Sequence, residues 1–268
     1  MKSATWKAPA IVSVWAAAAF LAAPCVQAVS LTFTWKGGAG NWTDANWAPS
    51  GTAGASGTTT NTNTALFNSA SAGAIAVDAN RNLQSLFFDT SAGSYTFSDG
   101  PLVLTNSGAI SLLSTVTGVN VIETFNTPIT LAGTGTFSNA RANAGSALGF
   151  AGNITNLATS TLTLSGAGTG TGNFISGNIS NGVGVQSVTV NATNATWTLS
   201  GANTYGGLTT LAGGTLVLAG SNNSGGATKL TGGTLQLNNA ANGGLATGTL
   251  TWSGGTLQSL LPAQTLSN

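Results

Sequence analysis

Three aspartates and one arginine are the residues of this chain that could support catalysis. Asp78, Asp89 and Asp99 lie 11 and 10 residues apart, and Arg81 follows closely after the first of them. Enzymes that cleave polysaccharides use carboxylates as acid, base or calcium ligand, and a cluster of the three with Arg81 would suit that chemistry. The spacing is about half of the repeat unit described below, which places alternate aspartates on opposite sides. We therefore expect solvated turn residues, and Asp99-Gly100 is itself typical of a turn.

Other catalytic chemistry finds little support in the sequence. Histidine is absent, which excludes Ser-His arrangements and most transition-metal sites. No Gly-x-Ser-x-Gly turn lies between a strand and a helix, and the glycine-rich run 166–172 lacks the lysine and the helix of a phosphate loop. The glycine–aspartate nonapeptide of calcium-bound solenoids is also absent. The sequence therefore predicts no catalytic residue, no cofactor-binding residue and no metal ligand, in a protein that is not an enzyme.

Three tryptophans near the start of the chain allow two interpretations. Trp35, Trp42 and Trp47 lie within thirteen residues of one another. Aromatic faces stack on sugars, so the three rings could form a carbohydrate-binding platform. Alternatively, they cover the open apolar end of the first coil of a stacked fold. We expect the second role.

Composition favours short strands joined by tight turns. Of the 268 residues, 38 are glycine, 42% are hydrophobic and only 4% are charged. Without the two lysines of the N-terminal segment, the chain has four basic and five acidic residues, which gives a net charge of −1. No basic patch can neutralise phosphates, so the composition excludes nucleic-acid binding.

The first 28 residues are typical of a secretory signal peptide. Lys2 and Lys7 precede an apolar stretch that is short for a membrane span, and small residues at 26–28 predict cleavage after Ala28. A membrane anchor is the alternative, and Cys25 raises lipidation as another, although the preceding proline fits that site poorly. Cleavage after Ala28 would remove the chain's one cysteine, which excludes disulfides and thiolate sites.

A short repeat in the last third predicts the shape of the chain. Residues 213–216, 232–235 and 254–257 each read Gly-Gly-Thr-Leu, at offsets of 19 and 22 residues. This is the length of one coil of a β-solenoid. Glycine pairs permit turns with positive φ, and the leucines of successive coils should form interior columns. The repeat therefore predicts stacked coils of parallel strands.

Strands are predicted upstream of the repeat as well, with an ordinary β-sandwich as the alternative for the first half. The expected strands are 65–67, 83–88, 95–97, 102–104 and 119–122. The predicted organisation is a signal peptide at 1–28, a Trp-rich cap and loop at 29–64, degenerate solenoid coils at 65–195 and the repeats at 196–268.

Residues 199–218 resemble the autotransporter-associated β-strand repeat, also called the passenger-associated transport repeat. The match lies in Leu-Ser-Gly-Ala-Asn-Thr-Tyr-Gly-Gly at 199–207, Thr-Thr at 209–210 and Ala-Gly-Gly-Thr-Leu at 212–216, with degenerate copies up to residue 257. The resemblance implies an all-β, right-handed parallel β-helix in a passenger region exported to the surface of a Gram-negative bacterium. Such proteins end in a membrane β-barrel, which this sequence does not include. We expect either a fragment of a longer protein or a secreted stand-alone solenoid.

The expected function is that of a non-enzymatic, secreted or cell-surface scaffold with an adhesive or structural role. No cofactor is expected. Binding would come from ladders of hydroxyl and amide groups, with surface polysaccharide or other cell-surface molecules as partners and self-association as a further option. Contact with a membrane would require a C-terminal region outside this sequence. The alternatives are a β-helical enzyme that acts on polysaccharide, through the aspartates, and a carbohydrate-binding module, through the tryptophans.

Overall fold

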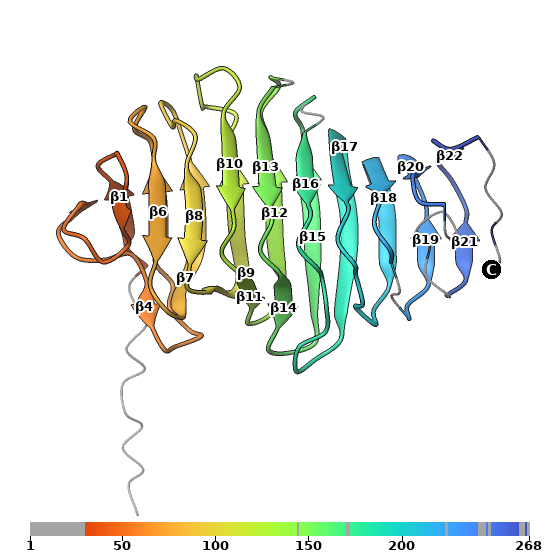
Figure 1. The fold of residues 1–268 in the computed structure, drawn as a ribbon, viewed down its shortest axis with the longest axis horizontal. Coiled ribbons are helices and arrows are strands. Elements are labelled where there is room, and N and C mark those ends of the chain that lie inside the picture. Colours follow the sequence, from red (N-terminus) through yellow and green to blue (C-terminus); the bar gives the residue numbers. More distant parts are fainter. Residues whose placement is uncertain are drawn as a thin grey trace, which may run out of the picture.

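The chain forms a solenoid of parallel β-strands. A computed structural model describes residues 30–143, 145–169, 172–222, 225–240, 245, 248–262 and 266. The predicted signal peptide lies outside these residues. The described strands join in one 22-stranded sheet whose coils stack along the long axis of the molecule (Figure 1). No helix among the described residues is long and apolar enough to cross a membrane. The predicted all-β parallel solenoid is confirmed, and the sandwich alternative for the first half is wrong.

Two ladders of parallel strands run nearly the full length of the described solenoid. Ladder 1 contains β1 (Thr32–Trp35), β5 (Thr64–Phe67), the second half of β7 (Arg81–Phe88), the second half of β9 (Leu102–Leu112), β12 (Gly135–Asn139), β15 (Ser160–Gly166), the first half of β17 (Gln186–Leu199), the first half of β18 (Thr209–Leu218), β19 (Thr228–Leu230) and β21 (Leu250–Trp252). Ladder 2 contains β2 (Gly40–Asn41), β6 (Ala74–Val77), β8 (Thr96–Asp99), β10 (Ile122–Phe125), β13 (Ala147–Phe150), β16 (Asn173–Ile175), the second halves of β17 and β18, β20 (Thr234–Leu237) and β22 (Thr256–Ser259).

A third ladder makes the early coils three-sided. Ladder 3 contains the first halves of β7 and β9, then β11 (Ile129–Leu131), β14 (Ile154–Asn156) and a bridge from Ile154 to Ile179. After this bridge the described coils pair through ladders 1 and 2. The coils shorten at the same point, since Leu211 pairs with Leu230 only 19 residues later.

Two short strands run against the others at the N-terminal end. Strand β3 (Trp47–Ala48) pairs antiparallel with β1, and β4 (Ala55–Ser56) pairs antiparallel with the start of β7. Both therefore cover strand edges of the first coils.

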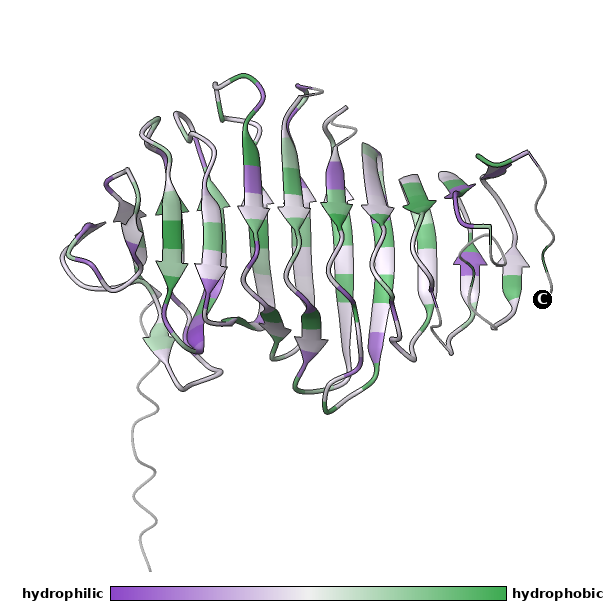
Figure 2. Ribbon diagram, viewed as in Figure 1, coloured by the Kyte–Doolittle hydropathy of each residue, from purple (hydrophilic) through white to green (hydrophobic). Residues whose placement is uncertain are grey.

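Alternation of apolar and polar residues places one side chain in two inside the solenoid. Figure 2 shows hydrophobic positions alternating with neutral or polar ones along the strands. In ladder 2, Leu218 pairs with Leu237 and Leu216 with Leu235, and all four are buried. Leu235 in turn pairs with Leu257. The predicted interior leucine columns are confirmed.

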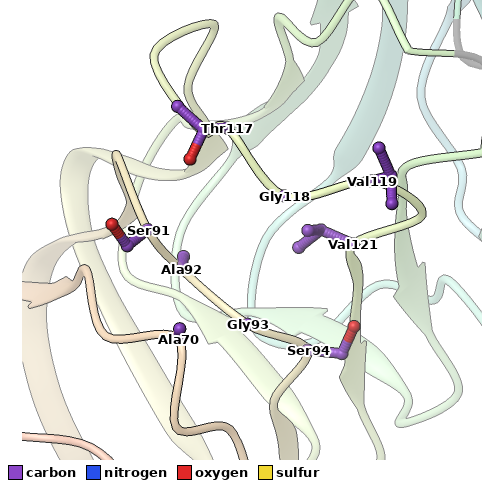
Figure 3. A pocket seen from close by; sticks show the side chains of 9 residues that line it. All are labelled: Ala70, Ser91, Ala92, Gly93, Ser94, Thr117, Gly118, Val119 and Val121. Atoms are coloured by element: carbon purple, nitrogen blue, oxygen red, sulfur yellow. The ribbon is translucent and has the colours of Figure 1, made fainter.

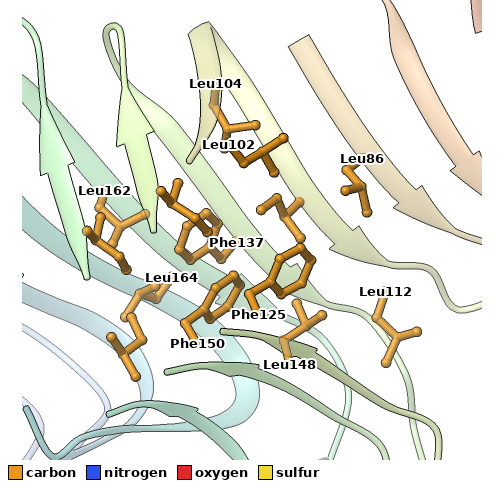
Figure 4. Packing of buried hydrophobic residues seen from close by; sticks show 14 of the residues in the cluster. Leu86, Leu102, Leu104, Leu112, Phe125, Phe137, Leu148, Phe150, Leu162 and Leu164 are labelled. Carbon is orange, nitrogen blue, oxygen red and sulfur yellow. The ribbon is translucent and has the colours of Figure 1, made fainter. Parts of the chain in front are cut away.

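Aromatic side chains replace leucine in the middle of the core. The ring centroids of Phe97 and Phe125 are 4.6 Å apart and those of Phe125 and Phe150 are 5.0 Å apart, with nearly parallel planes. Phe137 from ladder 1 stacks on Phe150 at 4.0 Å. Figure 4 shows Phe125, Phe137 and Phe150 together among the surrounding leucines. Stacked rings bury large apolar areas, so this column holds the central coils together.

Glycine supplies the corner between the two ladders in the repeat region. Gly214, Gly233 and Gly255 are the second glycines of the three Gly-Gly-Thr-Leu copies, and their φ values are +74°, +71° and +77°. A side chain disfavours this left-handed conformation. The predicted use of glycine at these turns is confirmed.

One predicted strand is wrong. The sequence predicts a strand at residues 119–122, but β10 begins only at Ile122. Val119 is 76% exposed, and Asn120 has a φ of +52°. The apolar residues here favour a strand, whereas Asn120 has a left-handed conformation two residues after Gly118 and turns the chain before the ladder begins.

Candidate functional site

Asp78 and Arg81 form an ion pair that holds a loop. Arg81 Nη2 lies 2.6 Å from Asp78 Oδ2, and Nε donates to Oδ1 at 2.8 Å. The remaining guanidinium nitrogen, Nη1, donates to the Gly54 carbonyl at 3.1 Å, and Arg81 is buried. Such two-point pairing fixes the orientation of both groups. The pair therefore joins the β4 loop to the start of β7.

Of the other two aspartates, Asp99 lies on the coil next to that of Asp78, whereas Asp89 lies at the end of a strand of the other ladder. Asp99 is exposed at the end of β8, where its neighbour in register is Val77, so Asp99 and Asp78 end neighbouring strands of ladder 2. Asp89 follows the end of β7 in ladder 1. The prediction that successive aspartates lie on opposite sides of the coil is confirmed, since Asp89 is on the other ladder from Asp78 and Asp99. Within the described ranges, no group of three or more acidic, histidine or cysteine side chains could hold a metal ion.

Asp89 takes part in a turn between two coils. Its carboxylate accepts a hydrogen bond from Thr115 Oγ1 and another from the Thr90 backbone N–H at 2.7 Å. The Thr115 hydrogen bond lowers the pKa of Asp89 below its ordinary value. The carboxylate is thus an acceptor for loop groups, and this geometry suits a turn residue.

One surface hollow lies between two loops that connect ladder 1 to ladder 2. It measures about 380 Å³ and is lined by residues of 91–94 and 117–121 together with Ala70 (Figure 3). Ser91, Ser94 and Thr117 supply its side-chain hydroxyls, and no ionisable side chain lines it. Its lining can donate and accept hydrogen bonds but offers no general acid or base.

Glu123 is a buried acid that does not belong to the candidate residues predicted from the sequence. It occupies an inward position of β10, where its neighbour in register on β13 is Leu148. Oε2 accepts the Tyr95 backbone N–H at 2.8 Å, and Oε1 has no hydrogen-bond partner among the described residues. Burial raises the pKa of Glu123 well above its ordinary value. The alternation of Val121, Glu123 and Phe125 in the sequence was a signal for this inward position.

The pKa of Tyr95, which lies beside Glu123, is raised as well. Burial, with the nearby Glu123 carboxyl second, raises the pKa of Tyr95 to about 12. The Tyr95 hydroxyl donates toward the backbone carbonyls of Ser69 and Ser71. Both titratable groups therefore serve as hydrogen-bonding groups within the wall of the coil.

The three tryptophans are inside the first coil. Trp35, Trp42 and Trp47 are at most 1% exposed, and the planes of neighbouring rings are inclined by 71° and 51°. The indole of Trp42 donates to the Ala53 carbonyl at 2.9 Å, and that of Trp47 donates to the Trp42 carbonyl at 2.7 Å. Rings buried at these angles cannot present a flat face to a sugar. The platform interpretation is wrong, and the packing agrees with a cap on the first coil.

Hydroxyl groups form regular columns on the outer surface. On ladder 1, Thr136, Thr163, Thr189 and Thr210 are neighbours in register on four successive coils, and each is partly exposed. On ladder 2, a second column contains Thr196, Thr215, Thr234 and Thr256. Strands in a ladder are about 4.8 Å apart, so each column presents hydroxyls at that interval. The outer surface is therefore regular, polar and largely uncharged.

Comparison with known families gives a match in the region of the shortest coils. The model of the family described as Passenger-associated-transport-repeat matches residues 194–218 and 213–237. Comparison with curated proteins and with solved structures finds no significant match in either. The two matched segments contain the end of β17, all of β18, β19 and β20, and the glycine corners at Gly214 and Gly233. The chain carries the passenger-associated transport repeat, in two overlapping copies that coincide with successive coils of its parallel β-solenoid.

Proposed function

We propose that this chain is an exported, non-enzymatic passenger scaffold, a right-handed β-helix displayed outside a Gram-negative cell. The observation that carries the proposal is the coincidence of the transport repeat with in-register coils at 194–237. The repeat and the solenoid both fit an autotransporter passenger domain. The predicted signal peptide at 1–28 supports export through the inner membrane.

The scaffold's adhesive role rests on its outer columns of hydroxyl groups. An uncharged surface with regularly spaced donors and acceptors suits a neutral, repeating polymer, and a surface polysaccharide has that chemistry. Each hydrogen bond contributes little by itself, so affinity comes from many equivalent contacts along the ladder. The sites for this contact are Thr136, Thr163, Thr189 and Thr210 on ladder 1.

Export is tested by expressing the full chain in a Gram-negative host. We expect mass spectrometry of the mature protein to place its first residue at Val29, and cell fractionation to recover the protein outside the cytoplasm. Retention of the uncleaved chain in the cytoplasm would contradict the proposal. A variant with Lys2 and Lys7 replaced by glutamate serves as the control for export by the signal, because it removes the positive start of that segment.

Adhesion is tested by co-sedimentation of the purified chain with insoluble neutral polysaccharides. We expect binding that is lost when Thr163 and Thr189 are both replaced by lysine. The matched control is a double replacement by lysine at Val183 and Val185, two exposed residues outside both threonine columns, which should retain binding. Equal loss in both variants, or binding that neither affects, would contradict the assignment to ladder 1.

The enzymatic alternative is tested on the same polysaccharides. Release of reducing ends or unsaturated sugars by the chain, abolished in Asp78→Asn or Asp89→Asn, would overturn the non-enzymatic proposal. We expect no release, because Asp78 is paired with Arg81, Asp89 accepts hydrogen bonds within a turn, and Asp89 lies on a different ladder from Asp78 and Asp99.

A further inference from the structure

The hollow between residues 91–94 and 117–121 has the dimensions of a small-ligand site (Figure 3). Its volume of about 380 Å³ lies within the range of pockets that hold small molecules. Small residues leave this space open, since two alanines and two glycines line it beside the hydroxyl-bearing and valine side chains. The threonine columns of ladders 1 and 2 include none of these residues. The hollow is therefore separate from the surface to which adhesion is assigned above.

Hydrogen bonds between the loops fix the walls of the hollow. The Thr117 backbone N–H donates to the Thr90 carbonyl at 2.6 Å, which ties the second loop to the first. The Ile122 N–H donates to Ser94 Oγ at 3.0 Å and makes a second tie between them. A ligand that enters such a preformed cavity does not have to order its walls, which lowers the cost of binding.

Strained backbone occurs in both walls. Thr90 is β-branched, yet its φ is +45°, and Asn120 in the other loop has a φ of +52°. A β-branched residue with positive φ is an outlier, and such residues persist only where surrounding contacts hold them, often at ligand sites. Arg141, which is buried, donates through Nη2 to the Gly118 carbonyl and so holds the loop that contains Asn120.

Two hydroxyl groups at the hollow retain opposite hydrogen-bonding capacities. Among the described residues, Ser94 Oγ makes one hydrogen bond, as acceptor of the Ile122 N–H, which leaves its proton to donate. Thr117 Oγ1 donates its proton to the Thr90 carbonyl at 3.2 Å, which leaves its oxygen to accept. A ligand hydroxyl both donates and accepts, so a ligand with adjacent hydroxyls can satisfy both groups.

The lining disfavours charged ligands and purely apolar ones. No ionisable side chain among the described residues lines the hollow, so an ionic group would lose hydration there without gaining a partner. A purely apolar ligand would cover the hydroxyls and leave them unpaired. Val119 is 76% exposed at the hollow, and Figure 3 shows Val121 directed into the space between the loops. A ligand that combines C–H faces with hydroxyl groups suits both parts of this lining.

From these features we propose that the hollow binds a single neutral sugar residue. Its C–H face lies against Val119 and Val121, and its hydroxyls accept from Ser94 and donate to Thr117. The site holds one sugar ring, whereas the threonine columns contact a run of a polymer. The inference does not rest on the adhesive role of ladder 1.

The experiment is a titration of the purified, ¹⁵N-labelled chain with the methyl glycosides of glucose, galactose and mannose, followed by NMR. We expect at least one glycoside to bind with a dissociation constant of about 1 mM, as few contacts allow. The shifted amide signals should be those of residues 91–94 and 117–121. Glucuronate adds a charge and cyclohexanol removes most hydroxyls, so each should bind at least about tenfold more weakly.

Two variants test the geometry of the hollow. Ala70→Leu fills the space from an exposed position and should weaken binding by at least about tenfold. Thr117→Val keeps the shape but removes the acceptor, so binding should weaken by about threefold to tenfold. The matched controls are Ala158→Leu and Thr159→Val, at exposed positions of the turn before β15, which should bind like the unaltered chain. The amide spectrum also shows whether each variant is folded.

Binding should be unchanged when Thr163 and Thr189 are both replaced by lysine, which separates this site from ladder 1. Failure of the polysaccharide co-sedimentation would then leave glycoside binding in place, and the two proposals can fail independently. The inference is overturned if none of the three glycosides binds, or if the shifted amides lie outside the two loops. Equal binding of glucuronate, or glycoside binding that persists in both Ala70→Leu and Thr117→Val, would also contradict it.

Discussion

Replacing Glu123 by glutamine should remove a pH-dependent loss of stability from the middle of the solenoid. The carboxyl group is fully buried at an inward position of β10, with one oxygen bonded to the Tyr95 N–H and the other without a partner among the described residues. Burial raises its pKa in the folded protein, because the ionised form loses its hydration. Glutamine keeps the shape and an acceptor oxygen but cannot ionise.

The magnitude follows from proton linkage. Below the ordinary value of 4.5, the carboxyl is protonated in both folded and unfolded chains and imposes no penalty. Above it, the unfolded chain releases the proton while the folded chain retains it. The free energy of unfolding therefore falls by about 1.4 kcal/mol for each pH unit, until the pH reaches the raised pKa of the folded state.

The assay is urea denaturation of the unaltered chain and Glu123→Gln at a series of pH values from about 4 to about 8. The advantage of the variant should grow with pH at the stated slope. Asp89, whose pKa is lowered, contributes with the opposite sign, since its stabilisation is present above its ordinary value of 3.8 and is lost as the pH falls. That effect is common to both chains and cancels in their difference. Asp99→Asn, at an exposed site, controls for net charge, and a difference independent of pH would refute the reasoning.

Three further changes test the core and its corners, with urea denaturation as the measurement. Phe150→Ala should lower the free energy of unfolding by about 3–5 kcal/mol, because it leaves a cavity beside Phe125, whereas Phe150→Leu should cost much less; similar losses would contradict the stacked column. Gly233→Ala should lower the free energy of unfolding by at least about 1–2 kcal/mol, because Gly233 has a φ of +71° and a backbone oxygen would lie 2.4 Å from the new Cβ. Gly225→Ala should be nearly neutral, because there is open space around Gly225. Trp42→Ala should cost about 3–5 kcal/mol through loss of the cap, and full retention of stability would show that the ring is dispensable there.

Much of the fold was predictable because its determinants are local. The Gly-Gly-Thr-Leu copies mark glycine corners and leucine columns at one-coil intervals, and both are where the repeat predicts them. Strands with strict alternation were also predictable, as in β15. The error at 119–122 arose where apolar residues occupy a turn, since composition there favours a strand while Asn120 adopts a left-handed conformation.

For the candidate site, the sequence predicted only that the three aspartates would not form one cluster. The spacing of Asp78, Asp89 and Asp99 indicated two sides of the coil, and the structure has them there. The hydrogen bond from Arg81 to the Gly54 carbonyl joins residues 27 positions apart, which no local pattern shows. Glu123 could have been identified from its inward position, but its missing partner depends on which residues the adjacent coils place beside it.

The solenoid, its glycine corners and its largely uncharged surface could be predicted from residue type and periodicity. The three ladders of the early coils and the burial of the tryptophans inside a covered first coil became apparent only from the packing of the coils. The physical reason is that stacking is a relation between coils. An apolar side chain is buried only when the next coil covers it, and the sequence of one coil does not state what its neighbour provides.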